Sequence, residues 1–124
     1  MKRTARHRGS HTTGRRGETW AAALLLIKGY RILARRFHAG GGEIDLVVKR
    51  GNTVVFVEVK ARHLLDDAVI AISPQKEVRL SRAVRYWLAR NSWAANMTLR
   101  CDAVFVARRR LPRHVPDVAT LAID

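Results

Sequence analysis

GEIDLVVKRGNTVVFVEVK, the stretch Gly42–Lys60, alternates apolar residues with other residues on both sides of Gly51-Asn52. This alternation predicts two β-strands joined by a tight hairpin. A two-residue loop at Gly51-Asn52 suits a primed turn, because glycine readily adopts the positive φ that the first loop position needs. Such a loop pairs Arg50 with Thr53 and thereby sets the register of the hairpin, which a bulge or a longer loop would change.

This register brings charged side chains together. Asp45 falls opposite Glu58, and Glu43 falls opposite Lys60. Because side chains alternate between the two faces of a strand, Asp45, Glu58 and Lys60 share one face. The other face is predicted to be apolar and buried, with Ile44, Leu46, Val48, Val55, Val57 and Val59 on it. Two carboxylates at a cross-strand distance of about 5 Å must share a proton, spread apart or hold a cation, and we favour a divalent metal.

Several short motifs together resemble a known nuclease fold. They are Gly14-x-x-Gly17-Glu18, Gly29-Tyr30, GEIDL at Gly42–Leu46 and FVEVKAR at Phe56–Arg62. An acid on one strand and Glu-Val-Lys on the next resembles the restriction-endonuclease-like, or PD-(D/E)xK, nucleases. The whole set, over residues 14–106, is similar to the YraN-type bacterial family of that fold. In two departures, Ile44 replaces a common proline, and Leu64–Ala68 replaces an expected glycine-containing loop.

The resemblance implies a metal-dependent DNA endonuclease. Asp45 and Glu58 would hold Mg²⁺ or Mn²⁺ as hard oxygen ligands, and the resemblance adds the Val59 carbonyl. It also implies that Glu18, on the first helix, reaches the metal cluster as an outer or second-metal ligand. The metal would activate a water molecule and screen charge on the scissile phosphate.

Two of the implied catalytic residues have alternative roles. Lys60 would orient the attacking water or stabilise the phosphate oxygens, but its register also allows an ion pair with Glu43. Glu18 has the alternative of favouring the positive end of a helix dipole. Asp102, on a late strand, is either a structural partner of an arginine or a catalytic residue. His63 and the pair Asp66-Asp67 are better explained as surface and loop residues than as parts of a site.

Composition narrows the class of protein. The 124 residues suit one domain with one core, and 24 Lys+Arg against 10 Asp+Glu give a formal net charge of +14. Such a charge points to a polyanionic partner, with DNA preferred over RNA because no aromatic platform for unpaired bases is visible. We expect no membrane span, because the longest apolar run, Trp20–Ile27, is short. The lone Cys101 suits a reducing compartment, so a cytoplasmic location is expected.

The N-terminal third contains a tail, a helix and a strand. Met1–Arg16 is predicted to be a disordered basic tail, which either adds affinity for phosphates or has no role. Gly17–Lys28 is predicted to be a helix that stops at Gly29. A signal peptide is a competing interpretation of this segment, against which the charges at both of its ends argue. Tyr30–Phe37 is predicted to be a strand, and its residues Arg31, Arg35 and Arg36 suggest a sheet edge or an outward face; a loop follows at His38–Gly41.

The second helix is predicted from Ser73-Pro74, a cap followed by a first-turn proline, to about Arg90. Its apolar stripe comprises Leu80, Ala83, Val84, Trp87 and Leu88. Lys76 aligns with this stripe at the helix start, so we expect it to point toward the carboxylates. The arginines on the other side favour a phosphate-binding face over plain solubilising charge. The candidate nucleic-acid-binding residues are Arg62, Lys76, Arg79, Arg82 and Arg85.

Met97–Ala107 completes the predicted α/β fold as a late strand. The order helix, three strands, helix and strand gives a small mixed sheet flanked by helices, within a domain at residues 17–110. Residues 111–124 form a tail that is either packed or loose. The leading hypothesis is an endonuclease for branched or structured DNA in repair or recombination, for which a homodimer stays open. The alternative is a non-catalytic nucleic-acid-binding module that keeps the fold.

Overall fold

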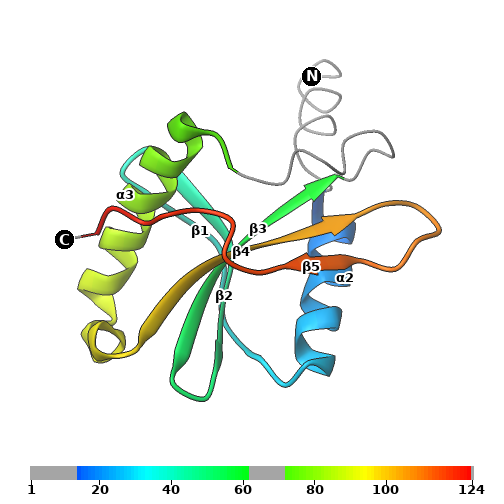
Figure 1. Ribbon diagram of the computed structural model, residues 1–124, viewed down its shortest axis with the longest axis horizontal. Coiled ribbons are helices and arrows are strands. Elements are labelled where there is room, and N and C mark those ends of the chain that lie inside the picture. Colours follow the sequence, from blue (N-terminus) through cyan, green and yellow to red (C-terminus); the bar gives the residue numbers. More distant parts are fainter. Residues whose placement is uncertain (1–13, 62–71, 124) are drawn as a thin grey trace.

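The computed structural model describes residues 14–61 and 72–123 and has a mixed α/β architecture. Helix α2 (Gly14–Ile27) leads into strands β1 (Arg31–Ala39), β2 (Gly42–Arg50) and β3 (Thr53–Ala61). Helix α3 (Pro74–Arg90) and a short 3-10 helix, η2 (Ser92–Asn96), precede strands β4 (Thr98–Val106) and β5 (Arg113–Val115). The five strands form one sheet in the order β1-β2-β3-β4-β5, and α2 and α3 lie on opposite sides of it (Figure 1).

The hairpin register is confirmed over most of its length. The β2–β3 ladder runs from Arg50↔Thr53 to Leu46↔Val57, as predicted, and Gly51 has a φ of 59°. Strands β3 and β4 are parallel, since α3 provides the crossover between them, whereas the other neighbouring strands are antiparallel. The sheet is therefore mixed, and β1 is an edge strand, which is one of the two positions that its arginines suggested.

The predicted apolar face is correct except for one residue. Leu46, Val48, Val55, Val57 and Val59 pack under α2, but Ile44 belongs to the cluster under α3. Alternation along β2 is interrupted between Ile44 and Leu46, which is where Asp45 lies. On β1, Arg36 sits between the residues paired with Ile44 and Leu46 and has a φ of 51°. This irregularity, which the alternating pattern did not show, turns Ile44 to the other side.

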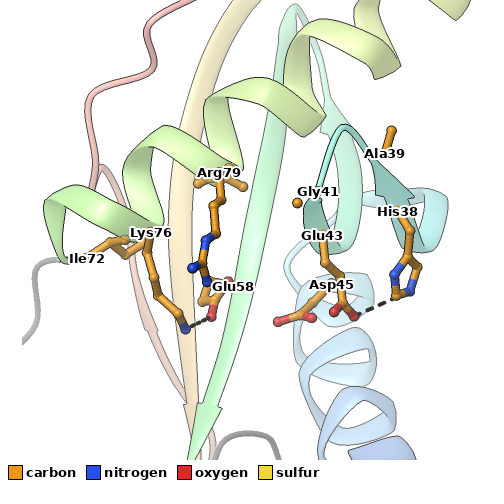
Figure 2. A pocket seen from close by; sticks show the side chains of 11 residues that line it. His38, Ala39, Gly41, Glu43, Asp45, Glu58, Ile72, Lys76 and Arg79 are labelled. Carbon is orange, nitrogen blue, oxygen red and sulfur yellow. Dashed lines mark hydrogen bonds and ion pairs between the residues drawn. The ribbon is translucent and has the colours of Figure 1, made fainter.

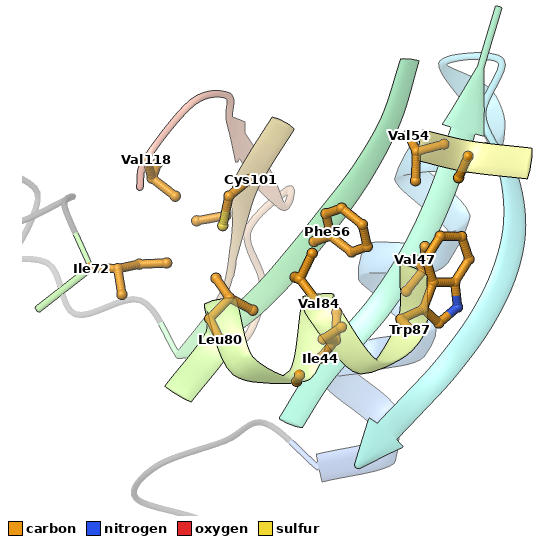
Figure 3. Close-up of a cluster of buried hydrophobic side chains, with 13 residues drawn as sticks. Ile44, Val47, Val54, Phe56, Ile72, Leu80, Val84, Trp87, Cys101 and Val118 are labelled. Atoms are coloured by element: carbon orange, nitrogen blue, oxygen red, sulfur yellow. The ribbon is translucent and has the colours of Figure 1, made fainter. Parts of the chain in front are cut away.

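Helix α3 matches its prediction at both ends. The Ser73 hydroxyl accepts a hydrogen bond from the Lys76 amide at 3.3 Å, and Asn91 caps the other end. Trp87 packs edge-on against Phe56, with ring centroids 5.5 Å apart (Figure 3). The predicted stripe is buried, with Leu88 partly buried at its side. The helix is thereby packed across β1 and β2, with Phe56 of β3 against Trp87.

The turn between β1 and β2 lies directly against α3. It is limited to Gly40 and Gly41, both with positive φ, so the loop predicted at His38–Gly41 is wrong in extent: β1 continues to Ala39. A Cβ at Gly42 would overlap the carbonyl oxygen of Arg79, and one at Gly40 would lie 2.5 Å from the Tyr86 ring. The glycines allow close backbone approach, and the approaching group is the helix.

The segment after β4 is packed, which resolves the two alternatives for residues 111–124 as far as Ile123. Strand β5 pairs with β4, and the Val118 amide donates to the Cys101 carbonyl at 2.8 Å. Val118, Leu121 and Ile123 join the core under α3, and the segment runs beside that helix (Figure 1). This segment thus contributes to the core that supports the helix.

At the N-terminal end, α2 begins at Gly14, so the predicted tail Met1–Arg16 extends too far; residues 1–13 lie outside the described part. Gly29, with a φ of 93°, follows the helix as predicted. Within the described ranges, neither helix is long and apolar enough to cross a bilayer.

Asp102 is a structural residue on the α2 side of the sheet. Its carboxylate is fully buried and accepts hydrogen bonds from Arg100 at 2.8 Å, from the Asp117 amide at 3.0 Å and from His114 Nε2 at 2.7 Å. Lys28 in turn lies 2.7 Å from Nδ1 of His114. The predicted partnership of Asp102 with an arginine is confirmed.

Candidate functional site

A pocket of about 690 Å³ lies between the first half of α3 and the adjoining ends of β1, β2 and β3. Figure 2 shows Lys76 and Arg79 pointing from α3 toward the carboxylates on the strands. The charged and titratable residues that line the pocket are His38, Glu43, Asp45, Glu58, Lys76 and Arg79. The two predicted metal ligands, Asp45 and Glu58, therefore face one space.

Asp45 is held by the backbone of the next strand. Its Oδ2 accepts a hydrogen bond from the Val59 amide at 2.7 Å, and the residue is only 7% exposed. The regular β2–β3 ladder ends at Leu46↔Val57, before it reaches the predicted pair Asp45 and Glu58. The Asp45 side chain thus accepts from the Val59 amide, which lies beyond the end of the β2–β3 ladder. This hydrogen bond fixes the orientation of the carboxylate.

Negative charge is concentrated around Asp45. Burial is the main cause that raises the pKa of this carboxyl to about 8, and the neighbouring charge of Glu58 raises it further. The Val59 hydrogen bond opposes both effects, whereas Glu43 and Glu18 add to them. Near neutral pH the Asp45 carboxyl of the folded protein is therefore protonated. A cation bound at this position would balance the same negative charge in place of the proton.

Lys76 supplies positive charge from α3, as its position on the helix predicted. Its Nζ lies 2.8 Å from Glu58 Oε2, and the Glu58 side chain is 16% exposed. The hairpin sequence alone placed no cation between these two carboxylates. The tertiary structure brings one from a different element, so Glu58 already has a counter-charge, while among the described residues Asp45 is held by the Val59 amide alone.

Lys60 does not have the neighbour that the register predicted. The ion pair with Glu43, which was the alternative role for Lys60, does not form, because the ladder ends before it reaches these residues. Glu43 instead faces His38 across the β1–β2 hairpin, 3.7 Å from its Nε2. Lys60 is partly buried and forms no ion pair with any residue that the structure describes. It follows Glu58 along the same face but is not among the described residues that line the pocket.

Glu18 lies on α2. It is buried, and both of its carboxylate oxygens accept from Arg36 Nε at 2.9 Å. The dipole alternative is wrong, because α2 begins at Gly14 and has no acid in its first turn. Glu18 acts on Asp45 through its charge, and it is not among the described lining residues of the pocket.

The candidate arginines do not form one face. Arg79 lines the pocket, and Arg82 donates to the Gly40 carbonyl at 3.3 Å. Arg85 donates instead to the Ala122 carbonyl, because the C-terminal segment runs beside α3. The predicted shared face of Arg79, Arg82 and Arg85 is therefore wrong for Arg85. Arg62, like His63 and Asp66-Asp67, lies outside the described residues.

The donor set suits a hard divalent cation. Asp45 and Glu58 provide two carboxylates, and Val59, which follows Glu58 in the chain and whose amide bonds Asp45, offers its carbonyl. Mg²⁺ commonly binds to one or two carboxylates and keeps several waters, so an incomplete protein ligand set is compatible with it. In the described residues no three His, Cys, Asp or Glu side chains gather as a metal-binding group. Cys101 is buried, and burial raises the pKa of its thiol to about 12.

The sequence interpretation missed two contacts near the pocket, His38 with Glu43 and Arg36 with Glu18. A two-residue loop at Gly40-Gly41, applied as at Gly51-Asn52, would have placed His38 opposite Glu43. The Arg36–Glu18 pair had no such signal, because the positive φ of Arg36 and the packing of α2 against the sheet both depend on tertiary structure.

Comparisons with known proteins identify relatives. The model of uncharacterised protein family UPF0102 matches residues 17–106. A UPF0102 protein of Methylorubrum extorquens is 59% identical over 113 residues, which are 91% of this chain and 88% of that protein. One from Methylobacterium nodulans is 56% identical over 110 residues, 89% and 85% of the two chains. One from Rhodopseudomonas palustris (strain HaA2) is 53% identical over 104 residues, 84% and 81% of the two chains.

Proposed function

The chain belongs to the uncharacterised protein family UPF0102, and we propose that it is a metal-dependent DNA endonuclease with a restriction-endonuclease-like core. One observation carries this proposal: Asp45 and Glu58, from adjacent strands, line the same pocket beside Lys76. The mixed sheet between α2 and α3 is compatible with such a core. The net charge of +14 supports a nucleic acid as the substrate.

The pocket residues have separate roles in the proposed reaction. Asp45, Glu58 and the Val59 carbonyl would hold Mg²⁺ or Mn²⁺, which supplies an activated water and screens phosphate charge when it is bound. The Val59 amide keeps Asp45 in the orientation that binding requires. Lys76 positions Glu58 through its 2.8 Å contact and presents positive charge to the scissile phosphate.

The remaining candidates act from the edges of the pocket. Lys60 shares the strand face of Glu58 and would donate to a phosphate oxygen of bound DNA. Glu18 acts through its charge, which adds to the field at Asp45. Arg79, exposed and pointing into the pocket, would contact a neighbouring phosphate (Figure 2). Branched or structured DNA as the substrate, and a homodimer as the active form, remain predictions of this proposal.

Cleavage assays test the proposal directly. Wild type is incubated with duplex, single-stranded, flapped and branched DNA, and with RNA, in Mg²⁺ or Mn²⁺. We expect Asp45→Asn together with Glu58→Gln to reduce cleavage about a hundredfold or more, because both metal ligands are lost. Glu77→Gln is the matched control, since this acid lies on α3 outside the pocket and faces Thr120. Cleavage that survives the double change would show that another site or a contaminant is responsible.

A binding module without catalysis is the second candidate. The Lys76–Glu58 contact favours it, because an ammonium ion there balances one carboxylate without any metal. Such a module would bind DNA equally well in EDTA and in Mn²⁺, with a steep dependence on salt, and would cleave none of the substrates. Metal-dependent cleavage by wild type that is absent in the Asp45→Asn, Glu58→Gln double variant would exclude the binding module.

A further inference from the structure

We propose that one face of α3 is a track for a single nucleic-acid strand leaving the pocket, with Tyr86 stacking on one of its bases. This inference rests on the proposed function, because it takes the pocket as the place where the strand is cut. It names the substrate class more closely: DNA with an unpaired segment beside the scissile phosphate, such as an overhang or a flap.

The residues of the track are spaced at helical intervals. Lys76, Arg79, Arg82, Tyr86 and Arg90 follow one another at three or four positions, which places them along one side of α3. The distance from the first to the last is about 21 Å at 1.5 Å per residue. That length spans about six nucleotides at the 3.4 Å rise of a B-form strand, and fewer in an extended one.

The charge of this face suits a phosphate backbone. Glu77 is the only acid in α3, and its carboxylate faces the Thr120 amide, in the C-terminal segment, and so lies off the track. Arg85 also lies off it, bonded to the Ala122 carbonyl of the same segment. The track is therefore cationic along its length and begins at the pocket, which Lys76 and Arg79 line.

Tyr86 is held in place by the β1–β2 turn. The ring packs so closely over Gly40 that a Cβ there would lie 2.5 Å from Tyr86 Cε2. Arg82 donates to the Gly40 carbonyl at 3.3 Å, which fixes the neighbouring side chain of the track. Arg90 lies 5.6 Å from the centre of the Phe37 ring, on β1. Tyr86 is nevertheless 49% exposed, so a fixed aromatic surface remains available among the arginines.

An aromatic ring between arginines favours an unpaired strand over a duplex. Bases are available for stacking only when they are unpaired, and a base stacked on an aromatic side chain contributes about 1–3 kcal/mol. Arginines before and after the ring would bind the phosphates of the same strand. A duplex would use the arginines alone and would gain nothing from Tyr86.

Binding in EDTA tests the track without any requirement for catalysis. The probes are a fluorescent oligothymidylate of about a dozen nucleotides and an abasic strand of the same length. We expect Tyr86→Leu to weaken binding of the oligothymidylate about tenfold, in line with the loss of one stacked base, and to leave binding of the abasic strand unchanged. Arg82→Gln should weaken binding of both strands and reduce its salt dependence.

Trp93→Leu is the matched control. Trp93 is 48% exposed, almost the same as Tyr86, but lies on η2 beyond the end of α3. We expect it to bind both probes like wild type, and thermal melting checks that each variant is folded. Equal losses in Tyr86→Leu and Trp93→Leu, or equal losses on the two probes, would overturn the track. If Tyr86→Leu behaves as expected but wild type cleaves nothing, the track stands and the nuclease proposal fails.

Discussion

At the scale of single residues, Asp45 dominates the pocket because it is an acid in a place that disfavours its charge. Burial and Glu58 raise its pKa to about 8, against about 4 in an unfolded chain. Between these two values the unfolded chain releases its proton while the folded protein keeps it. The contribution of Asp45 to the free energy of unfolding therefore falls as the pH rises from about 4 to about 8, and levels off above that range.

The first prediction follows from this sign. Asp45→Asn removes the titrating group but keeps an oxygen that can accept from the Val59 amide. We expect the variant to be more stable than wild type at about pH 8, by a few kcal/mol, and nearly equal to it at about pH 4. Urea unfolding at several pH values measures the difference, with Glu77→Gln as the control. A constant offset between the two proteins at every pH would contradict the raised pKa of Asp45.

The second prediction concerns metal binding at the same carboxylate. A divalent cation must displace the Asp45 proton below about pH 8, so its affinity should fall about tenfold for each pH unit below that value. Calorimetry in buffers of different ionisation enthalpy should detect close to one proton released per Mn²⁺ bound near neutral pH. Asp45→Asn should bind Mn²⁺ weakly and release none. Binding without proton release would place the metal elsewhere.

The third prediction separates the two lysines. Lys76 contacts Glu58 at 2.8 Å, whereas Lys60 is partly buried further along the same strand. Lys76→Gln removes a cation that competes with the metal, so Mn²⁺ should bind on the order of threefold more tightly even though cleavage declines. Lys60→Gln should leave the affinity for Mn²⁺ nearly unchanged and affect cleavage alone. The opposite assignment would identify Lys60 as the partner of Glu58 in solution.

At the scale of elements, local patterns predicted the parts that local physics determines. The Gly51-Asn52 turn set the β2–β3 register, and Ser73 with Pro74 set the start of α3. Patterns failed where two elements meet. The end of the ladder at Asp45, the Arg36–Glu18 pair and the position of Arg85 each depend on a second segment that packs nearby. Alternation and helix periodicity contain no information about that segment.

The fourth prediction concerns the contact between α3 and the β1–β2 turn. A Cβ at Gly42 would overlap the backbone oxygen of Arg79, which cannot move without displacing the helix. Gly42→Ala should therefore lower the free energy of unfolding by about 3 kcal/mol. It should also disturb the arrangement of α3 against the β1–β2 turn, both of which line the pocket. Gly51→Ala is the comparison: its Cβ meets nothing within 4 Å, so only its φ of 59° is unfavourable, at about 1 kcal/mol. Equal effects would mean that the helix adjusts.

At the scale of the whole molecule, the two faces of the sheet have different tasks. The α3 side carries the pocket and the proposed track, whereas the α2 side carries a polar network around Asp102. That network joins segments that are distant in sequence: Arg100 on β4, His114 on β5 and Lys28 after α2. The strand pattern predicted an arginine partner for Asp102. It gave no sign of His114, because β5 and its pairing with β4 were not predicted.

The last prediction tests this division. Burial alone would raise the pKa of Asp102, but hydrogen bonds from His114, Arg100 and the Asp117 amide outweigh it and hold the pKa at about 2. Because this value lies below that of an unfolded aspartate, about 4, Asp102 stabilises the fold above about pH 4, and the contribution is lost as the pH falls toward 2. Asp102→Asn should cost about 3–5 kcal/mol near neutral pH, since it leaves the partly buried Arg100 without its counter-charge. The variant should also lose part of the acid dependence of wild-type unfolding.

Because Asp102 lies on the α2 side, the fraction of Asp102→Asn that remains folded at low temperature should bind Mn²⁺ with wild-type affinity. A variant that is equally destabilised but has lost Mn²⁺ binding would show that the two faces are coupled through the sheet.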